Sequence, residues 1–222
     1  MGCALAEMLE RDRTLRAGLS GSEIKIIGIS GSLRSRSSNT EALKAAALVP
    51  PASVTVTVYD GLADLPAFNP DLDTPGAMVP ASVQDFRARI GAADAVFICS
   101  PEYAHGVPGS LKNALDWLVS SSEMLFKPIG LLNVSPRSTH AYASLAETLR
   151  TMSTVIVEDA SIELPLSENR LDAAAIAARA EFAEPLRRAI AALCEAAQEY
   201  RVRRDELRAM AGEVSPAATV PR

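Results

Sequence analysis

Residues 24–30 read Ile24-Lys25-Ile26-Ile27-Gly28-Ile29-Ser30, and this stretch decides the fold. It is short, rich in β-branched residues and followed at once by a glycine, as is typical of a buried strand. Runs of similar strand character recur along the chain, at residues 54–59, 95–99, 129–134 and 154–157.

Helical patterns separate these runs. They lie at residues 41–48, 82–92, 108–120 and 139–152, then after Asp172, and in a last segment that carries Leu186, Ile190, Leu193 and Ala197. Pro185 is expected in the first turn of that last helix or just before it. Alternating strands and helices predict an α/β domain with a five-stranded parallel sheet and helices on both faces. Because ligands of such sheets bind beyond the carboxyl ends of the strands, the loops after the first, third and fourth strands form the candidate site.

The composition is that of an ordinary globular protein and argues against several classes. Hydrophobic residues make up 48% of the 222 residues, and 22 basic against 27 acidic side chains give a net charge of −5. A nucleic-acid binder would need a basic face, and aromatic residues at 5% offer few stacking platforms for bases. The basic run Arg201-Val202-Arg203-Arg204 is expected to be a solvated helix face. No apolar stretch is long enough to span a membrane.

The ends of the chain and its cysteines lead to further expectations. Residues 1–22 are expected to be a mobile extension without a signal peptide, residues 23–211 the folded domain and residues 212–222 a tail. The cysteines are far apart and form no CxxC pair, so no metal site is expected; they are Cys3, Cys99 and Cys194. Reduced thiols fit a cytoplasmic protein better than a secreted one.

The loop after the first strand, Ser30 to Thr40, has the chemistry of a phosphate site. It holds several hydroxyls and leads into a helix, whose N-terminus offers free N–H groups. Arg34 adds a charged, bidentate donor. The spacing of Ser38 and Glu41 predicts a capping box and a helix start near Asn39. The loop lacks both the GxxxxGK[ST] lysine and the GxGxxG pattern, and the alternative to a phosphate site is a serine-rich turn with a good cap.

Two motifs resemble a known family. The first has the form GSLRxxSxN and begins at Gly31. The second follows the third strand, where Pro101-Glu102-Tyr103 precedes a helix of the form PGxLKNALDW from Pro108 to Trp117. In this order and at strand ends, the two motifs are similar to those of the NADPH-dependent FMN reductases in the flavodoxin-like superfamily, which include quinone, azo-dye and chromate reductases. The resemblance covers about residues 24 to 200.

The resemblance implies a flavodoxin-like fold that binds FMN. The phosphate of the FMN would be held by Ser32, Leu33, Arg34, Ser37 and Asn39. The edge of the isoalloxazine would run along Pro101, Glu102, Tyr103 and Ala104. The loop after the fourth strand would touch the polar edge of the flavin through Ser135 and Arg137, where the family often has a glycine-rich turn.

Several residues of these loops have more than one reading. Many relatives carry Asn where this chain has Ala104, which matters only if that amide touches flavin or substrate. His105 either protonates a substrate or is an exposed loop residue. Arg137 either stabilises negative charge on the reduced flavin, attracts the phosphate of a nicotinamide nucleotide, or is simply exposed. Ser138 or Thr139 is expected to cap the next helix. Trp117 is expected in the core or in a subunit interface.

The resemblance implies an enzyme, an FMN-dependent NAD(P)H oxidoreductase. It would pass a hydride from NADPH or NADH through bound FMN to a small acceptor such as a quinone, a flavin or an azo compound. Because the flavin carries the chemistry, no catalytic side chain is assigned. Family members form homodimers or homotetramers, which is the expectation here. The alternative is a flavodoxin-type electron carrier without NAD(P)H activity of its own, against which Arg34 and the modest net charge count. A third reading is a site for a sugar phosphate or a nucleotide.

Overall fold

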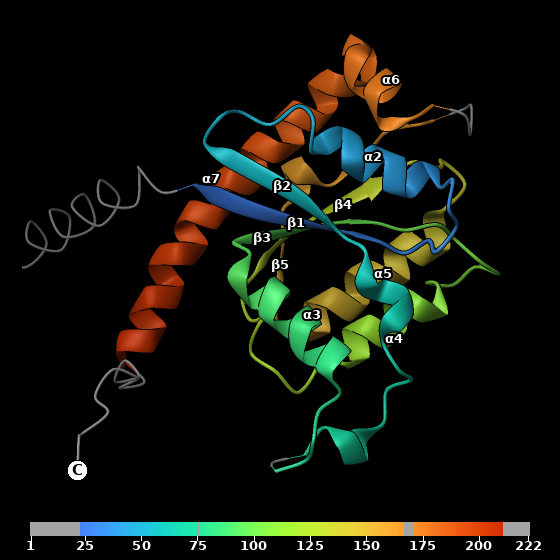
Figure 1. Ribbon diagram of the computed structural model, residues 1–222. Coiled ribbons are helices and arrows are strands. Elements are labelled where there is room, and N and C mark those ends of the chain that lie inside the picture. Colours follow the sequence, from blue (N-terminus) through green and yellow to red (C-terminus); the bar gives the residue numbers. More distant parts are fainter. Residues whose placement is uncertain (1–22, 75, 167–170, 211–222) are drawn as a thin grey trace, which may run out of the picture.

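The structure is a computed structural model that describes residues 23–74, 76–166 and 171–210 (Figure 1). Its strands are β1 (Ile24–Ser30), β2 (Val54–Tyr59), β3 (Ala95–Cys99), β4 (Pro128–Asn133), β5 (Val155–Ile156) and β6 (Ile162–Glu163). Its α-helices are α2 (Ser38–Ala46), α3 (Ala81–Ala92), α4 (Gly109–Asp116), α5 (Thr139–Thr151), α6 (Ala173–Ala178) and α7 (Ala180–Met210). Short 3₁₀ helices are η1 (Gly61–Asp64), η2 (Pro70–Leu72) and η3 (Glu158–Ala160). The expected extension and tail, residues 1–22 and 212–222, lie outside the described residues.

The sheet confirms the predicted fold class. Its strands are parallel and follow the order β2-β1-β3-β4-β5, which is the order of flavodoxin-like proteins. The strand position beyond β4 is divided, since β5 pairs with Pro128 and Ile129, and β6 pairs with Leu132 and Asn133 after the turn η3. β6 was not predicted from the sequence, because a strand of two residues shows no periodicity.

Helices cover both faces of the sheet, as predicted. One core lies between the sheet and α2, α6 and α7, and the other lies between the sheet and α3, α4 and α5 (Figure 1). The expected apolar face of α7 is fully buried in the first core; its residues are Leu186, Ile190, Leu193 and Ala197. Trp117 is buried in the second core, packs edge-on against Phe68, and donates its Nε1–H to Pro66 O at 2.8 Å.

The last helix begins earlier than expected. α7 starts at Ala180, so Pro185 lies inside the helix and not in its first turn. The buried Ala183 shows why: the packed face of the helix extends a turn toward the N-terminus from Leu186. Tertiary packing therefore outweighs the hydrogen bond that a proline removes from a helix interior.

The helix α2 also begins differently from the prediction. It starts at Ser38, with Ser37 at the N-cap position, one residue before the N-cap that the predicted capping box requires. The Glu41 carboxylate accepts a hydrogen bond from Ala173 N–H at 2.9 Å, at the start of α6. Glu41 therefore binds a residue 132 positions away in the chain.

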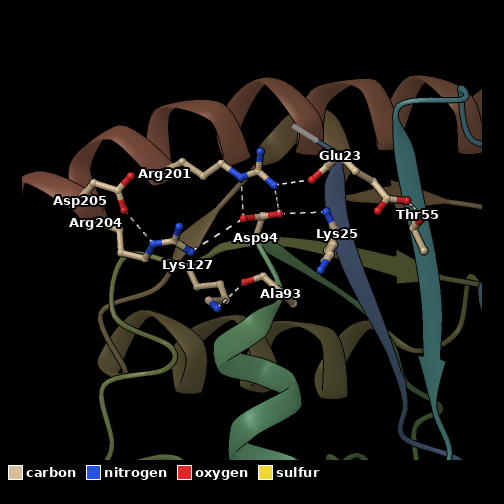
Figure 2. Close-up of polar contacts among 9 residues, drawn as sticks. All are labelled: Glu23, Lys25, Thr55, Ala93, Asp94, Lys127, Arg201, Arg204 and Asp205. Atoms are coloured by element: carbon tan, nitrogen blue, oxygen red, sulfur yellow. Dashed lines mark hydrogen bonds and ion pairs between the residues drawn. The ribbon is translucent and has the colours of Figure 1, made fainter. Parts of the chain in front are cut away.

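The basic run near the C-terminus is not a solvated face, contrary to the prediction. Arg201 is only 7% exposed and donates to both carboxylate oxygens of Asp94, through Nε at 2.7 Å and Nη2 at 2.6 Å (Figure 2). A guanidinium nitrogen of Arg204 lies 3.8 Å from the same carboxylate, which also accepts from Lys25 N–H at 2.9 Å. Asp94 therefore joins the C-terminal part of α7 to the start of β1.

A buried lysine lies beside this ion pair. Lys127 is fully buried, and its Nζ donates to Ile90 O and to Ala93 O, both at 2.6 Å. These carbonyls lie at the C-terminus of α3, where a positive charge is favourable. Lys127 thus satisfies backbone acceptors at the amino end of the sheet, beside the ion pair of Asp94 with Arg201.

Two of the three cysteines lie in the described part of the chain, and both are free thiols, Cys99 and Cys194. Burial raises the pKa of both thiols, that of Cys194 to about 11. Both thiols are therefore protonated at neutral pH, while Cys3 lies outside the described residues. Among the helices of the described residues, none is long and apolar enough to cross a membrane.

Candidate functional site

A cavity of about 640 Å³ opens beyond the carboxyl ends of β1, β3 and β4. It is lined by residues of the loops that follow these strands and of the segment after β6: Ser32, Arg34, Arg36, Ser37, Ser38, Asn39, Pro101, Glu102, Tyr103, Val134, Ser135, Pro136, Arg137, Ser138, Pro165 and Leu166. This volume is within the range of small-molecule sites. The loops that the sheet topology made candidates therefore form one site.

The path of the first loop is fixed by close packing. Gly31 N–H donates to Cys99 O at 2.9 Å, and a Cβ at Gly31 would lie only 2.6 Å from Ser100 Oγ. A side chain at this position would push the loop away from β3, which explains the glycine. The hydroxyls of Ser30 and Thr40, at the two ends of the loop, are hydrogen-bonded at 2.8 Å. The loop is therefore closed at its base and anchored to the neighbouring strand.

The side chain of Asn39 is oriented by a hydrogen bond from a buried thiol of β3. Cys99 Sγ donates to Asn39 Oδ1 at 3.2 Å, across 60 positions of the chain. Burial raises the pKa of the Cys99 thiol, so the proton needed for this bond is present. With its oxygen engaged, Asn39 has its amide NH₂ left as a donor, and the residue lines the cavity.

Ser37 carries a buried hydroxyl that has no partner in the described residues. The residue is 4% exposed, lines the cavity and is the N-cap of α2, yet its side chain makes no capping hydrogen bond. An unsatisfied buried hydroxyl is unfavourable, so such a group points to a ligand that completes it. Because the first N–H groups of α2 lie at the same place, the missing ligand is best an anion.

The charge of the cavity agrees with an anionic ligand. Arg34, Arg36 and Arg137 line it with exposed side chains. Within residues 23–74, 76–166 and 171–210, none of these guanidiniums forms an ion pair. A phosphate monoester carries about −1.5 to −2 charges at neutral pH, which two arginines would neutralise. The chain is acidic as a whole, so this local excess of positive charge is a property of the site.

Among the described residues that line the cavity, Glu102 carries the carboxylate, and that carboxylate is already hydrogen-bonded. Its Oε2 accepts from Ala141 N–H at 2.8 Å, in the first turn of α5. Ser138 is the N-cap residue of α5, one of the two expected, but its side chain makes no capping hydrogen bond. The helix dipole stabilises the Glu102 carboxylate, and its charge therefore opposes an anion in the cavity less.

The second motif forms a tight turn at the mouth of the cavity. Tyr103 and Gly106 exchange backbone hydrogen bonds of 3.2 and 2.9 Å. The two residues between them have positive φ, 50° for Ala104 and 59° for His105. Tyr103 is 57% exposed and lines the cavity with its ring. His105 is exposed, and its ring stacks on that of His140.

The cavity brings together most of the residues expected from the sequence. Leu33, which is 57% exposed, and Ala104, at the tip of the turn, do not line it. Other lining residues were not expected as ligand contacts from the sequence: Arg36, Ser38, Val134, Pro136, Ser138, Pro165 and Leu166. Arg36 lies only two positions after Arg34, so its place in the loop was a usable signal. Pro165 and Leu166 follow β6, and without that strand nothing places them at the site.

The donors that line the cavity have the chemistry of an anion site. In the residues that the structure describes, no three His, Cys, Asp or Glu side chains gather to hold a metal ion. The cavity offers guanidiniums, hydroxyls, an amide and helix N–H groups, which are ligands for an anion. A phosphate group with a planar organic part fits this arrangement, because Arg34, Arg36 and the buried Ser37 hydroxyl come from the first loop and the aromatic Tyr103 comes from another loop of the lining.

Comparisons with known proteins agree with this geometry. The family described as NADPH-dependent FMN reductase matches residues 24–165. A NAD(P)H-dependent FMN reductase of Pseudomonas aeruginosa is 34% identical over 156 residues, which are 68% of this chain and 83% of that protein. A quinone reductase of Escherichia coli is 36% identical over 96 residues, and the match spans 43% of this chain and 50% of that protein.

A solved structure extends the comparison to the whole fold. It is the flavoenzyme NAD(P)H:acceptor oxidoreductase of Paracoccus denitrificans, which superposes with a TM-score of 0.63 at 26% identity. The superposition covers 80% of this chain and 98% of that one.

Proposed function

Because this chain belongs to the family of NADPH-dependent FMN reductases, we propose that its cavity binds FMN by the phosphate, next to Ser37. The chain is an FMN-dependent NAD(P)H oxidoreductase, as its relatives are. The observation that carries the site is the buried Ser37 hydroxyl, which has no partner among the described residues and faces a cavity rich in unpaired arginines.

The residues present fit the phosphate of FMN. The hydroxyls of Ser32 and Ser37, the amide of Asn39 and the guanidinium of Arg34 supply its donors, together with the first N–H groups of α2. Leu33 would contribute through its backbone, since its side chain lies outside the lining.

The other loops fit the flavin head. Pro101, Glu102 and Tyr103 would run along the isoalloxazine edge, with Ala104 at the tip of the turn. Because the Glu102 carboxylate is engaged by α5, it is the backbone of this segment that is available to the flavin. Ser135 and Arg137 would meet the flavin from the loop after β4.

Bound FMN supplies the redox chemistry, accepting a hydride from NADPH or NADH and passing the electrons to an acceptor. The chain binds and orients the group, and the guanidiniums keep the site electropositive. The acceptor is of quinone or flavin type; an azo compound remains part of the proposal. We propose a quinone as the acceptor because quinone reductases are among the relatives, although the match spans only about half the length of those proteins.

The experiment that tests the function measures NADPH oxidation by the purified protein, with FMN and a quinone present and no partner reductase. Without oxygen and with FMN no more concentrated than the protein, we expect steady oxidation that stops when either the quinone or the FMN is left out. A flavodoxin-type carrier would bind FMN but oxidise no NADPH on its own, and that outcome would replace the proposal with the carrier.

Replacing Ser37 with alanine separates a ligand-binding hydroxyl from a structural one. We expect FMN binding to weaken about tenfold, because one hydrogen bond to a charged phosphate is lost. We expect the FMN-free protein to unfold at the same or a higher temperature, since an unsatisfied buried hydroxyl is removed. Flavin fluorescence titration and thermal unfolding measure the two effects. Ser35→Ala is the matched control, because Ser35 is exposed in the same loop and lies outside the lining; a loss of stability in FMN-free Ser37→Ala would mean that the hydroxyl is structural.

Assembly and location complete the proposal. Homodimers or homotetramers, a cytoplasmic location and a folded domain of residues 23–211 are predictions that rest on the family and on the sequence pattern. Light scattering of the purified protein tests the first of them.

A further inference from the structure

The turn at the mouth of the cavity is held in a conformation that its residues disfavour. Tyr103 and Gly106 exchange two backbone hydrogen bonds, and Ala104 and His105 between them both have positive φ. Two-residue turns of this kind favour Asn-Gly, because glycine and asparagine tolerate the left-handed region. Alanine and histidine are strained there, and such strain persists only where surrounding contacts hold the backbone in place.

The contact that reaches the tip of this turn is a stack of two imidazoles. The rings of His105 and His140 have their centroids 4.2 Å apart and their planes within 17° of parallel. They are the two histidines of the chain, from the loop after β3 and from the first turn of α5. A second contact joins the same elements, because Glu102 accepts from Ala141 N–H. The segment 102–105 is therefore fastened to α5 at both of its ends.

We propose that His140 is a positioning residue, which holds His105 and thereby sets the turn that places Tyr103 in the cavity. The proposal rests on the proposed function, since Tyr103 matters only if the cavity binds FMN. His140 is not among the described residues that line the cavity. Its effect on a ligand must pass through the turn.

Hydrogen exchange of FMN-free protein tests the local part of the proposal. The Gly106 N–H donates to Tyr103 O at 2.9 Å and reports on closure of the turn. We expect His140→Ala to speed exchange at Gly106, and His140→Phe to restore slow exchange, because phenylalanine can stack without an imidazole. Ser144→Ala is the control, one turn further along the exposed face of α5. Unchanged exchange at Gly106 in His140→Ala would overturn the proposal.

Binding of FMN tests the functional part. We expect His140→Ala to raise the dissociation constant of FMN about 2- to 12-fold, the range of one lost aromatic contact. His140→Phe should recover most of the affinity. A turn that supports itself should no longer need His140. In the background Ala104→Asn with His105→Gly, adding His140→Ala should therefore change the dissociation constant far less than it does in the wild type.

Failure of this inference is distinguishable from failure of the proposed function. If the wild-type protein binds no FMN, the proposed function is wrong and the binding test has no ligand. The exchange test still applies, because it uses the FMN-free protein. If the wild type binds FMN and His140→Ala equals it in affinity and in exchange at Gly106, the role of His140 is overturned while the proposed function stands. An equal loss in both turn backgrounds would show that His140 acts by another route and would also overturn the proposal.

Discussion

Replacing Arg34 with alanine is expected to weaken FMN binding by about 1.5–3 kcal/mol, or roughly 10- to 150-fold, the range for hydrogen bonds to a charged group. Arg34 lies in the first loop, lines the cavity and forms no ion pair with the described residues, so its charge is free for a ligand. The dissociation constant is measured by fluorescence titration of the FMN-free protein.

Riboflavin provides the control for this prediction, because it lacks the phosphate. Its weaker binding should be nearly the same in the wild type and in Arg34→Ala. Arg188→Gln, an exposed arginine of α7 away from the site, should change neither constant. If Arg34→Ala weakened both ligands equally, or weakened neither, Arg34 would not be a phosphate ligand.

Replacing Asp94 with asparagine is expected to cause the largest loss of stability, about 3–5 kcal/mol. The substitution leaves the buried Arg201 guanidinium without its counter-charge, and it weakens the bond that Lys25 N–H donates to the same carboxylate. For a domain of this size, such a loss lowers the unfolding temperature by about 6–20 °C. Chemical denaturation followed by circular dichroism measures the free energy of unfolding.

A double-mutant cycle shows whether the pair is the cause. Arg201→Gln removes the buried charge, so the double variant with Asp94→Asn should be more stable than the sum of the single effects, by about 1 kcal/mol or more. FMN affinity should change little, because Asp94 precedes β3 and the cavity lies beyond the opposite end of that strand. Strictly additive losses would mean that the two side chains stabilise the fold independently.

The sequence predicted the elements whose signals are local. β3 was expected at its observed bounds, because five apolar residues between polar neighbours permit little else. β1 and the buried face of α7 follow from the same logic of periodicity and composition. The alternation of these elements along the chain predicted a parallel sheet, and such a sheet predicted that the site lies in the loops after the first, third and fourth strands. The position of the site was therefore predictable before any side chain was placed.

The features that were missed or wrong depend on contacts between distant parts of the chain. Arg201 was expected in solvent because its partner, Asp94, lies 107 positions away. The cap of α5 is Glu102 from another loop, although two closer residues have the right chemistry. β6 is too short to show a pattern, and Pro165 and Leu166 were missed with it. For Arg201 and for the cap of α5 a tertiary partner outweighed the local signal, whereas β6 gave no local signal at all.

The central claim is that the first loop binds FMN by its phosphate, and a crystal structure of the protein grown with FMN tests it most directly. We expect the phosphate within hydrogen-bond distance of Ser37 Oγ and the Arg34 guanidinium, and the isoalloxazine beside Pro101 to Tyr103. A structure in which Ser37 keeps no partner while FMN lies elsewhere, or in which the cavity is empty at saturating FMN, would contradict the account.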